Sequence, residues 1–595
     1  MIKLKNYELN IEKYFILLSF VFFNIFILSW NYSYLPLTEG WFLLAGKFIE
    51  EGYLPYNDFY AYLTPFYYWY SFFILKLGEE TIFISRILGQ LNLNILFFLT
   101  YKILNINFPK SQSIVSALFA MIFYLSINAI LSYDFIHITN IFAFISYYLI
   151  VTKKDNKYLF FAGLFAAMCF LTKQSNGAVI FFTLFIIFIY KFKNSMNLII
   201  YPFMGSLTAV VINFFPFLTI EGLKIVMDNI IINAGGAKGG IAHSLTTLIP
   251  PKSDFYSLEK LLKFILKILL PLMVILKFHY LFGKKTDNLF TFKEIHNISF
   301  TKNHFLIFII ISIILIIFYF FKIQDIYLLN HITDFFFNRI YLWSGYCPII
   351  FILFYKNKNF DKTLGILLLG LTFAAATSAG LTTVSIFLHV AFLICLLLSL
   401  KTFYNFGLIL AFSVIFSYSS IAIIEKNIKT YHWWGVNSYK GNYESYKIQF
   451  ISKIKNDGIG KNLENINNAL SKCKNKPSNL IAFPHGALIN LTTKIKPPTP
   501  TVSYWFDFLS NRDAEIELKK LKQKKLDIIV IIEVDELAWK THEALFRPED
   551  KYLAQRKIYQ YLRENTDSPN YSKIYDFYQD TTNVEVFSNK ELLCN

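Results

Sequence analysis

The stretch Leu37-Thr38-Glu39-Gly40-Trp41 follows the first long apolar run of the chain, residues 14–30. A run of that length is enough for one helical crossing of a hydrocarbon core about 30 Å thick. Similar runs recur along the first 424 of the 595 residues. The sequence therefore predicts an α-helical polytopic membrane protein, with a carboxylate placed where its first membrane helix ends.

The composition agrees with this class. Hydrophobic residues make up 55% of the chain, with 65 Phe and 39 Tyr, which is too apolar for a soluble protein of this size. We expect about thirteen membrane spans. They lie near residues 14–30, 81–104, 113–131, 135–152, 158–172, 176–192, 197–219, 258–280, 304–321, 337–355, 362–379, 382–400 and 404–423.

The net charge of +17 follows from 57 basic and 40 acidic residues. The lysines gather in alternate loops, such as Lys153, Lys154 and Lys157 between two predicted spans, and cytoplasmic loops of membrane proteins carry this excess. We therefore expect a multi-pass plasma (inner) membrane protein with a cytoplasmic N-terminus and no nucleic-acid partner. An odd number of spans then places the C-terminal segment outside the cytoplasm.

Three domains are predicted. Residues 1–424 form the transmembrane domain, with a large first external loop at 31–80, and residues 425–450 form an interfacial linker whose Trp433-Trp434 pair suits a membrane boundary. Residues 451–595 lack long apolar runs and are expected to form an extracytoplasmic α/β domain.

Within this last part, strands are expected at 480–484, 527–532, 573–578 and 583–587, and a helix at about 551–564. The β-branched run at 527–532 is typical of a central parallel strand. Ser510 and Asp513 have the spacing of a capping box, which predicts a helix that runs to about Lys525. Strands alternating with helices suggest a small Rossmann-like sheet, but no G-x-G-x-x-G motif supports a dinucleotide cofactor.

No metal is expected, because no cluster of His, Asp and Glu has the spacing of metal ligands. His137 and His331 are interpreted as hydrogen-bonded or interfacial, as is His485, for which a contact with an acceptor substrate is the alternative. Of the five cysteines, only Cys473 and Cys594 could meet outside the membrane, and their spacing alone does not establish a disulfide.

The first external loop carries two carboxylates of interest, Glu39 and Asp58. A helix is expected to begin with Thr38 as its N-cap and to end near Gly52, because the apolar residues that follow Thr38 recur at helical spacing. Partial desolvation raises the pKa of a carboxylate and suits it to act as a general base on a hydroxyl. The alternative is structural: Glu39 favours a helix N-terminus and Asp58 caps a turn.

This loop resembles that of the polytopic GT-C glycosyltransferases, which include protein O-mannosyltransferases and lipid A aminoarabinose transferases. The resemblance lies in Glu39-Gly40-Trp41, in Pro55-Tyr56 followed by Asp58-Phe59, in Pro65 with Tyr67-Tyr68, and in Ser85-Arg86. It implies many membrane helices, often a C-terminal α/β domain, and sugar transfer from a polyprenyl-phosphate donor on the outer face. Many relatives carry Asp-Glu where this chain has Thr38-Glu39, so Glu39 is favoured as the base and Asp58 is its alternative.

Five further residues are candidates for binding substrate or phosphate near the outer face: Arg86, Asp134, Lys173, Lys238 and Arg339. A departing lipid phosphate needs cationic partners, because negative charge develops on its oxygens. Lys173 is preferred, since the relatives have a similar Leu-Thr-Lys turn. The alternative for each lysine is snorkelling at a span end.

Lys238 lies in the glycine-rich stretch 235–240, which is predicted to be a loop with backbone N–H groups turned toward phosphate. The stretch lacks the Gly-Lys-Ser/Thr ending of a P-loop. Its role as a phosphate site is therefore a hypothesis from glycine content alone.

We therefore expect a membrane glycosyltransferase that moves a sugar from a polyprenyl-phosphate donor to a lipid, glycan or protein acceptor, with inversion at the anomeric carbon. Two alternatives stay open. A transporter or flippase would place charged or Gly/Pro-broken segments deep in the spans and would show repeated halves. A catalytically silent scaffold would use its soluble domain to bind partners.

Overall fold

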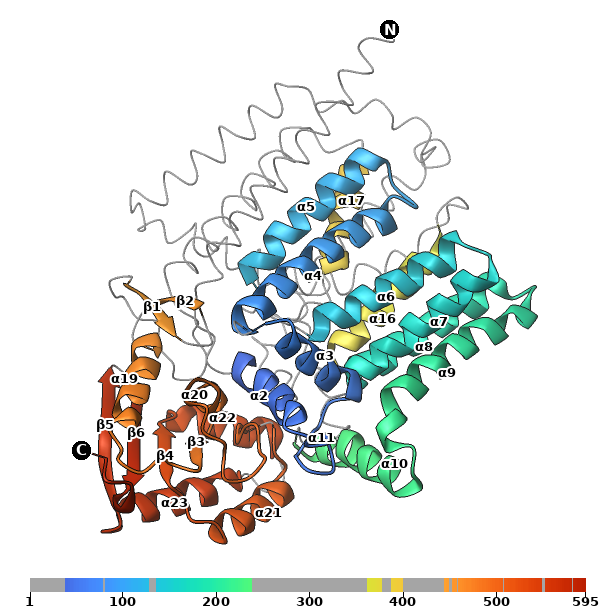
Figure 1. Ribbon diagram of the computed structural model, residues 1–595. Helices are drawn as coiled ribbons and strands as arrows, with labels where there is room; N and C mark the ends of the chain where they lie inside the picture. The colour runs from blue at the N-terminus through green and yellow to red at the C-terminus, as the bar shows by residue number, and fades with distance from the viewer. Residues whose placement is uncertain are drawn as a thin grey trace, which may run out of the picture.

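The computed structural model joins a helical bundle to a smaller α/β unit (Figure 1). The two parts are in contact along α2 and the loop that follows it. The structure describes residues 38–78, 81–127, 135–237, 361–376, 387–399, 444–448, 452–456, 459–506, 508–547, 552–579 and 582–594.

The described part of the bundle is built from α-helices with short 3₁₀ and π segments. Six of the predicted spans, from 81–104 to 197–219, coincide with helices within a few residues. The elements are α2 (Thr38–Glu50), α3 (Pro65–Lys76), α4 (Thr81–Leu104), α5 (Lys110–Ile127), α6 (Phe135–Thr152), α7 (Asn156–Thr172), α8 (Gln174–Phe192), η1 (Met196–Ile199), α9 (Ile200–Phe214), η2 (Phe215–Phe217), α10 (Ile220–Met227), η3 (Asp228–Asn233), α11 (Ala234–Ala237), α16 (Lys362–Ala376) and α17 (Phe387–Ser399).

Among the described residues, four helical segments are long and apolar enough to cross a bilayer: Ile82–Leu104, Phe135–Thr152, Gln174–Phe192 and Met196–Phe217. Each coincides with a predicted span. Five other predicted spans, at 14–30, 258–280, 304–321, 337–355 and 404–423, lie outside the described residues. The number of thirteen spans therefore stays a prediction.

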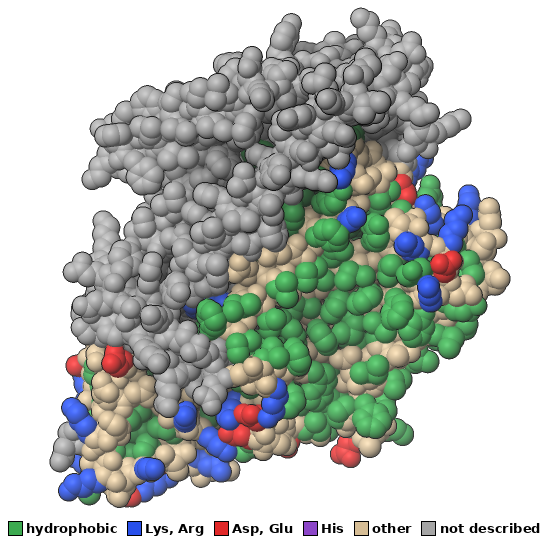
Figure 2. Space-filling model, turned by 45° about the horizontal axis from the view of Figure 1, so that its top comes forward, with side chains coloured by type: hydrophobic (Ala, Val, Ile, Leu, Met, Phe, Trp, Pro, Cys, Tyr) green, Lys and Arg blue, Asp and Glu red, His purple; other side chains and the backbone are tan. Residues whose placement is uncertain are grey.

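The outer surface of these helices is apolar. Figure 2 shows a broad face of hydrophobic side chains, with Lys, Arg, Asp and Glu at its margins. An apolar surface this wide suits contact with lipid rather than water. Large hydrophobic residues exposed on α4, α7, α8 and α9 include Phe98, Phe161, Phe182, Phe185, Ile186, Phe203, Met204, Leu207 and Ile212.

Glycines allow helices α7 and α9 to pack backbone against backbone. A Cβ added to Gly163 would lie 1.9 Å from the carbonyl oxygen of Pro202, and one added to Gly205 would lie 1.9 Å from that of Phe160. Ser206 Oγ also donates to the carbonyl of Gly163 at 2.9 Å. Small residues drive such packing in membranes, where burial of apolar surface offers little gain.

The loops predicted to be cytoplasmic meet at one end of the bundle. Asp361 donates its backbone N–H to Asn107 Oδ1 at 2.9 Å, and Lys191 Nζ lies 3.3 Å from Asp361 Oδ2. These contacts join the α4–α5 turn, the end of α8 and the start of α16. The alternation of loops predicted from the lysines is therefore consistent with the packing of the helices.

The α/β unit contains a four-stranded mixed sheet of order β3-β4-β6-β5. A separate antiparallel pair, β1 (Glu444–Ile448) and β2 (Ser452–Asn456), precedes it. The remaining elements are α19 (Ile459–Ser471), β3 (Leu480–Phe483), α20 (Ala487–Thr493), α21 (Asn511–Lys522), β4 (Ile528–Ile532), α22 (Glu536–Phe546), α23 (Gln555–Thr566), β5 (Tyr571–Gln579), β6 (Thr582–Asn589) and η7 (Lys590–Leu592).

Strand β4 is buried near the middle of this sheet, as its β-branched sequence predicts, but only one of its neighbours is parallel. It pairs in parallel with β3 and antiparallel with β6. A purely parallel Rossmann-like sheet is therefore not what forms, because β5 and β6 are joined by a hairpin and add antiparallel strands. Ser510 is the N-cap of α21: its Oγ accepts from the backbone N–H of Asp513 at 3.1 Å and donates to Asp513 Oδ2 at 2.5 Å.

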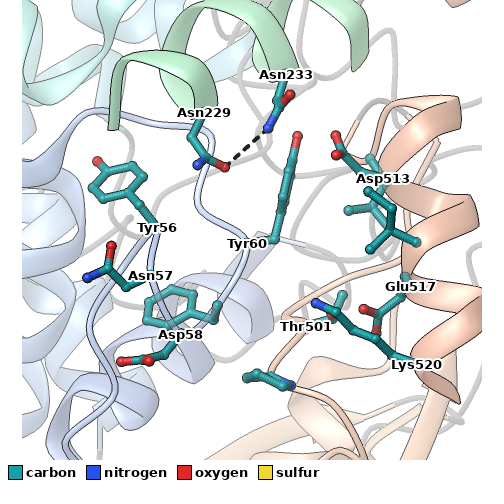
Figure 3. A pocket seen from close by; sticks show the side chains of 14 residues that line it. Tyr56, Asn57, Asp58, Tyr60, Asn229, Asn233, Thr501, Asp513, Glu517 and Lys520 are labelled. Carbon is teal, nitrogen blue, oxygen red and sulfur yellow. Dashed lines mark hydrogen bonds between the residues drawn. The ribbon is translucent and has the colours of Figure 1, made fainter. Parts of the chain in front are cut away.

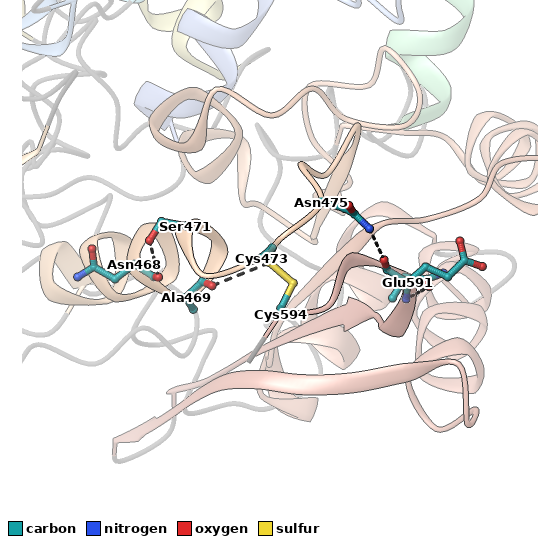
Figure 4. The surroundings of a disulfide bond; sticks show 8 residues. Asn468, Ala469, Ser471, Cys473, Asn475, Glu591 and Cys594 are labelled. Atoms are coloured by element: carbon teal, nitrogen blue, oxygen red, sulfur yellow. Dashed lines mark hydrogen bonds between the residues drawn. A yellow bond between two sulfur atoms is a disulfide. The ribbon is translucent and has the colours of Figure 1, made fainter.

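A disulfide joins Cys473 to Cys594 (Figure 4). It ties the turn after α19 to the end of the chain, 121 residues away. Backbone contacts on both sides support it, since Asn475 N donates to the Leu592 carbonyl at 3.1 Å and Asn475 Nδ2 donates to that of Glu591 at 2.8 Å. The sequence identified this pair as the one that could meet, without establishing the bond.

The α/β unit docks against α2 and the loop that follows it. Figure 1 shows α2 between the bundle and the α/β unit. The Phe508 ring lies 5.6 Å from Trp41 and 4.5 Å from Tyr62, measured between ring centroids. A salt bridge of 2.9 Å joins Lys496 to Glu51 at the edge. The first loop, the bundle and the α/β unit thus share one hydrophobic core.

Candidate functional site

Helix α2 presents Glu39 at the junction of the two parts. The described part of the helix starts at Thr38, so the backbone of Glu39 lies in it; the side chains of both residues are outside the described part, and the role of Thr38 as N-cap stays a prediction. The next residue, Gly40, faces α20 so closely that an added Cβ would lie 2.6 Å from the backbone nitrogen of Leu488. The start of α2 is therefore held against the α/β unit.

Asp58 caps a turn of the first loop. Its Oδ2 accepts from the backbone N–H of Leu54 at 2.6 Å, and its own N–H donates to the Leu54 carbonyl at 2.9 Å. The side chain is exposed to solvent. This geometry is the one expected of the structural alternative, and nothing in it marks Asp58 as a base.

The turn holds Tyr56 in the left-handed region at φ 71°, which is uncommon for a residue with a side chain. The ring is buried, and its hydroxyl donates to the carbonyl of Leu63 at 2.5 Å. The buried ring and its hydrogen bond stabilise this conformation, so the first loop is fixed rather than free.

Arg86 lies in the second turn of α4 and is only 3% exposed. The N-terminal half of α4 packs against α2 and α3, with Ile82 in the shared core. Arg86 is therefore buried at the same end of the bundle as the first loop.

Lys173 is the single residue between α7 and α8, and it is 5% exposed. Its Nζ lies 4.2 Å from the centroid of the Phe135 ring, a cation–π distance. The next residue, Gln174, donates through Nε2 to the carbonyls of Tyr62 at 2.6 Å and Ile230 at 3.1 Å. Lys173 therefore lies beside the first loop; that this end of the bundle is the outer face stays a prediction.

The other three candidates, Asp134, Lys238 and Arg339, lie outside the described residues. The glycine-rich stretch that precedes Lys238 is partly helical, because residues 234–237 form α11. Its first half therefore differs from the predicted loop.

Several polar residues of this end were not singled out from the sequence. Asn140 and Asn176 are 2% and 1% exposed, and the Oδ1 of Asn140 and the Nδ2 of Asn176 have no hydrogen-bond partner in the described structure. Asn140 lies in the second turn of α6, and Asn176 lies in the first turn of α8, three residues after Lys173. Helices α6 and α8 pack against each other. The sequence did carry a signal for them, namely an amide side chain within an apolar helix. Burying such a polar group costs free energy, so it is kept chiefly for function.

Arg547 is a second residue that sequence reasoning missed. It is buried and donates to its neighbour Phe546 and to three acceptors farther away in the chain: the carbonyl of Ala237 at 2.7 Å, the carbonyl of Leu509 at 2.8 Å and Asn511 Oδ1 at 2.9 Å. These belong to α11, to the loop before α21 and to α21 itself. The guanidinium therefore fixes the end of the 228–237 segment to the α/β unit.

His485 is buried beside Trp505, with ring centroids 5.3 Å apart. Burial lowers the pKa of its imidazole to about 4, because a desolvated cation is disfavoured. The ring is therefore neutral near pH 7. Its Nδ1 has no hydrogen-bond partner among the described residues, so the predicted hydrogen-bonded role is not what the structure shows for that atom.

A cavity of about 180 Å³ opens where the first loop, η3 and the α/β unit meet (Figure 3). We call it the seam cavity. No group of three or more His, Cys, Asp or Glu side chains in the described ranges is arranged to hold a metal ion. The residues that line the seam cavity are Tyr56, Asn57, Asp58, Phe59, Tyr60, Asn229, Asn233, Pro500, Thr501, Leu509, Asp513, Ile516, Glu517 and Lys520.

Residues 63–220 match the family model of the dolichyl-phosphate-mannose-protein mannosyltransferases. The match includes Arg86, Asp134 and Lys173, whereas Glu39, Asp58, Lys238 and Arg339 lie outside it. The resemblance to polytopic glycosyltransferases that the sequence indicated is thus confirmed over this stretch.

No curated protein matches the chain at a significant level. Among solved structures, the chain is similar to the crystal structure of ArnT from Cupriavidus metallidurans bound to undecaprenyl phosphate. That similarity has a TM-score of 0.41 at 9% identity and covers 97% of this chain and 98% of that one.

Proposed function

We propose that this protein is a membrane glycosyltransferase that moves a sugar from a polyprenyl-phosphate donor to an envelope acceptor on the extracytoplasmic face. The family match over 63–220 supports the reaction class. The arrangement of the outer end of the bundle supports a phosphate-bearing lipid substrate there.

The observation that carries the proposal is the burial of two cations, Arg86 and Lys173, at the end of the bundle that faces the first loop. Charged groups inside a membrane domain are costly and are kept chiefly for function. Cations beside a departing phosphate stabilise the charge that develops on its oxygens as the sugar leaves. The acidic residues of the first loop do not by themselves explain why two cations are buried there.

In the proposed reaction a carboxylate takes the proton of an acceptor hydroxyl. The hydroxyl oxygen then forms a bond with the anomeric carbon as the bond from that carbon to the phosphate oxygen breaks, and polyprenyl phosphate leaves. One displacement of this kind inverts the anomeric configuration. Arg86 and Lys173 would hold the phosphate, with Asp134, Lys238 and Arg339 as further candidates near it.

Glu39 is the preferred base. The carboxylate of Asp58 already accepts the Leu54 N–H and is exposed to solvent, so it is committed to the turn. Glu39, in contrast, starts a helix that is enclosed between the bundle and the α/β unit. Asp58 remains the alternative.

The disulfide supports an extracytoplasmic α/β unit, because such bonds persist in oxidising compartments and are rare in the cytosol. The α/β unit packs on the first loop, so both belong on one side of the membrane. The lysine-rich loops at the opposite end are then cytoplasmic, as is the N-terminus.

Transfer of radiolabelled sugar from a polyprenyl-phosphate donor tests the proposal. Purified protein in lipid nanodiscs is mixed with donor and with membrane and polysaccharide fractions of the envelope. We expect label to appear in one acceptor fraction and free polyprenyl phosphate to accumulate. Absence of transfer to every fraction, together with absence of donor binding, would refute it.

A further inference from the structure

The seam cavity belongs to neither part of the molecule alone. Its walls come from the first loop, from the π segment η3 and from α21 with the preceding Pro500-Thr501 segment. Its volume of about 180 Å³ is far above the roughly 15 Å³ that one water needs. A small organic group, rather than a single ordered water, therefore fits it.

The charge of the lining excludes a phosphate. Three residues with carboxylates, Asp58, Asp513 and Glu517, and one with an ammonium, Lys520, line the cavity. An anion entering the cavity would meet net repulsion, so the cavity is not a second site for the lipid phosphate. A carboxylate offers about four lone-pair positions, which favours a ligand that donates several hydrogen bonds.

Existing contacts of these carboxylates leave acceptor capacity. Asp513 Oδ2 accepts from Ser510 Oγ at 2.5 Å, and Glu517 Oε1 accepts from Thr499 and from Tyr504, the latter at 3.3 Å. No hydrogen bond to the other carboxylate oxygen of either residue is among those found in the described structure. Each of these two carboxylates is thus held in place through one oxygen, and its other oxygen can accept hydrogen bonds from a ligand.

Amide groups supply both donors and acceptors from the opposite wall. Asn229 and Asn233 are four residues apart in η3, and Asn233 Nδ2 contacts Asn229 Oδ1 at a long 3.4 Å. π segments recur at functional sites because they turn side chains out of the regular helical order. Here both amides line the cavity.

Tyr60 stands between these walls. Figure 3 shows its side chain between Asn233 and Asp513. Burial, reinforced by the charge of Asp513, raises the pKa of the Tyr60 phenol, so the hydroxyl keeps its proton and can donate at any physiological pH. The ring offers an apolar face beside polar groups, as a site for a partly apolar, hydroxyl-rich ring requires.

We propose that the seam cavity binds one neutral sugar ring of the acceptor. Carboxylate and amide oxygens would accept from its hydroxyls, while Tyr60, the amides and Lys520 would donate to its oxygens. The inference rests on the proposed glycosyltransferase function and adds that the acceptor is a glycan or glycolipid, recognised by the α/β unit and the membrane domain together.

The position of the cavity suits an acceptor site. The Phe508 ring lies near both Tyr60 and Trp41, at 6.0 Å and 5.6 Å between centroids. Trp41 is two residues beyond Glu39. Only the Phe508 ring would therefore separate a glycan bound in the cavity from Trp41 near the start of α2, where the proposed base is.

Direct binding of methyl glycosides is the first arm of the test. Saturation-transfer NMR on the full-length protein in nanodiscs, with EDTA present, uses the methyl glycosides of glucose, galactose, mannose and N-acetylglucosamine. We expect at least one to bind, and Asn233→Leu and Lys520→Met each to weaken that binding at least fivefold. Lys519→Met is the matched control, because Lys519 lies on the same helix outside the cavity, and it should bind like wild type.

Tyr60→Phe keeps the ring and removes the hydroxyl, so this variant replaces Asn233→Leu in the binding test if Asn233→Leu fails to fold. It should weaken binding severalfold at an unchanged melting temperature. If no glycoside binds, or if all three cavity variants bind as well as the Lys519→Met control, the sugar site is refuted.

Sugar transfer is the second arm and separates this inference from the function on which it rests. In the cavity variants the KM for the glycan acceptor should rise at least fivefold, with the KM for the donor unchanged. Donor turnover with an unchanged acceptor KM would refute the cavity and keep the glycosyltransferase. Glycoside binding by a wild-type protein that neither binds nor uses the donor would refute the glycosyltransferase and keep a sugar site.

Discussion

At the scale of single residues, the first loop separates two carboxylates that look equivalent in the sequence. Asp58 is engaged in a turn and faces solvent, whereas Glu39 begins a helix enclosed by the α/β unit. Spacing alone could not distinguish them, because the packing partner of α2 lies some 450 residues further along the chain. The difference leads to opposite expectations for their amide variants.

Glu39→Gln should reduce sugar transfer by roughly 10²–10⁴-fold, the usual contribution of a general base, with donor binding retained. Asp58→Asn should transfer within a few-fold of wild type, because its amide oxygen can still accept from Leu54. Initial rates of label transfer measure both. Equal losses in the two variants would contradict the assignment, and full activity in both would favour a silent scaffold.

His485 predicts a dependence of stability on pH. Burial lowers its pKa from 6.5 to about 4 in the folded protein, so the unfolded chain binds a proton first as the pH falls. The free energy of unfolding is therefore not reduced by this group above pH 6.5. As the pH falls from 6.5 toward 4, it decreases by about 3 kcal/mol in all.

Thermal unfolding of the α/β unit within the full-length protein, followed by tryptophan fluorescence between pH 7 and 4.5, checks this expectation. His485→Gln should flatten the acid side of the curve relative to wild type. A variant curve that is parallel to that of wild type would show that other groups cause the acid loss.

At the scale of elements, apolar runs predicted helices well because period and length suffice to define a span. The segments 81–104 and 135–152 were predicted to the residue. The helix α22 was missed, although Asp535 caps its first turn, and the antiparallel β5–β6 hairpin was not distinguished from the rest of a Rossmann-like sheet. Strand direction depends on connections that composition does not reveal.

The contact of α7 with α9 gives a test at this scale. Gly163→Ala places a methyl group against the Pro202 carbonyl and should destabilise the solubilised protein by about 1–3 kcal/mol, as overpacking does. Gly235→Ala is the matched control, because nothing lies within 4 Å of its added Cβ, and removing a helical glycine should stabilise by up to about 1 kcal/mol. Melting temperatures in one detergent compare the two; a similar change in both would contradict the packing.

At the scale of the whole molecule, the site is built by docking of two parts. The sequence predicted a membrane domain and a soluble domain but could not predict that α2 lies between them. It placed Arg86 and Lys173 near the outer face, yet gave no sign of the seam cavity or of Arg547, since both arise only from contacts between distant segments.

Arg547 tests the docking. Arg547→Lys loses the fork of donors that reaches Ala237, Leu509 and Asn511, and hydrogen bonds from a charged group contribute about 1.5–3 kcal/mol each. We expect hydrogen exchange to increase at residues 228–237 and 508–511, with the exchange of β4 unchanged. Arg512→Lys, an exposed neighbour on α21, should leave exchange as in wild type. If the Arg547 variant exchanged no faster than that control, the guanidinium would not be holding the seam.

The buried cations are the central claim, and the affinity of the protein for polyprenyl phosphate tests it most directly. Native mass spectrometry of the nanodisc-released protein gives that affinity for wild type, Lys173→Met and Lys153→Met, the last being an exposed lysine at the opposite end of the bundle. The account predicts at least tenfold weaker binding for Lys173→Met and wild-type binding for Lys153→Met. Equal affinity in all three proteins would contradict it.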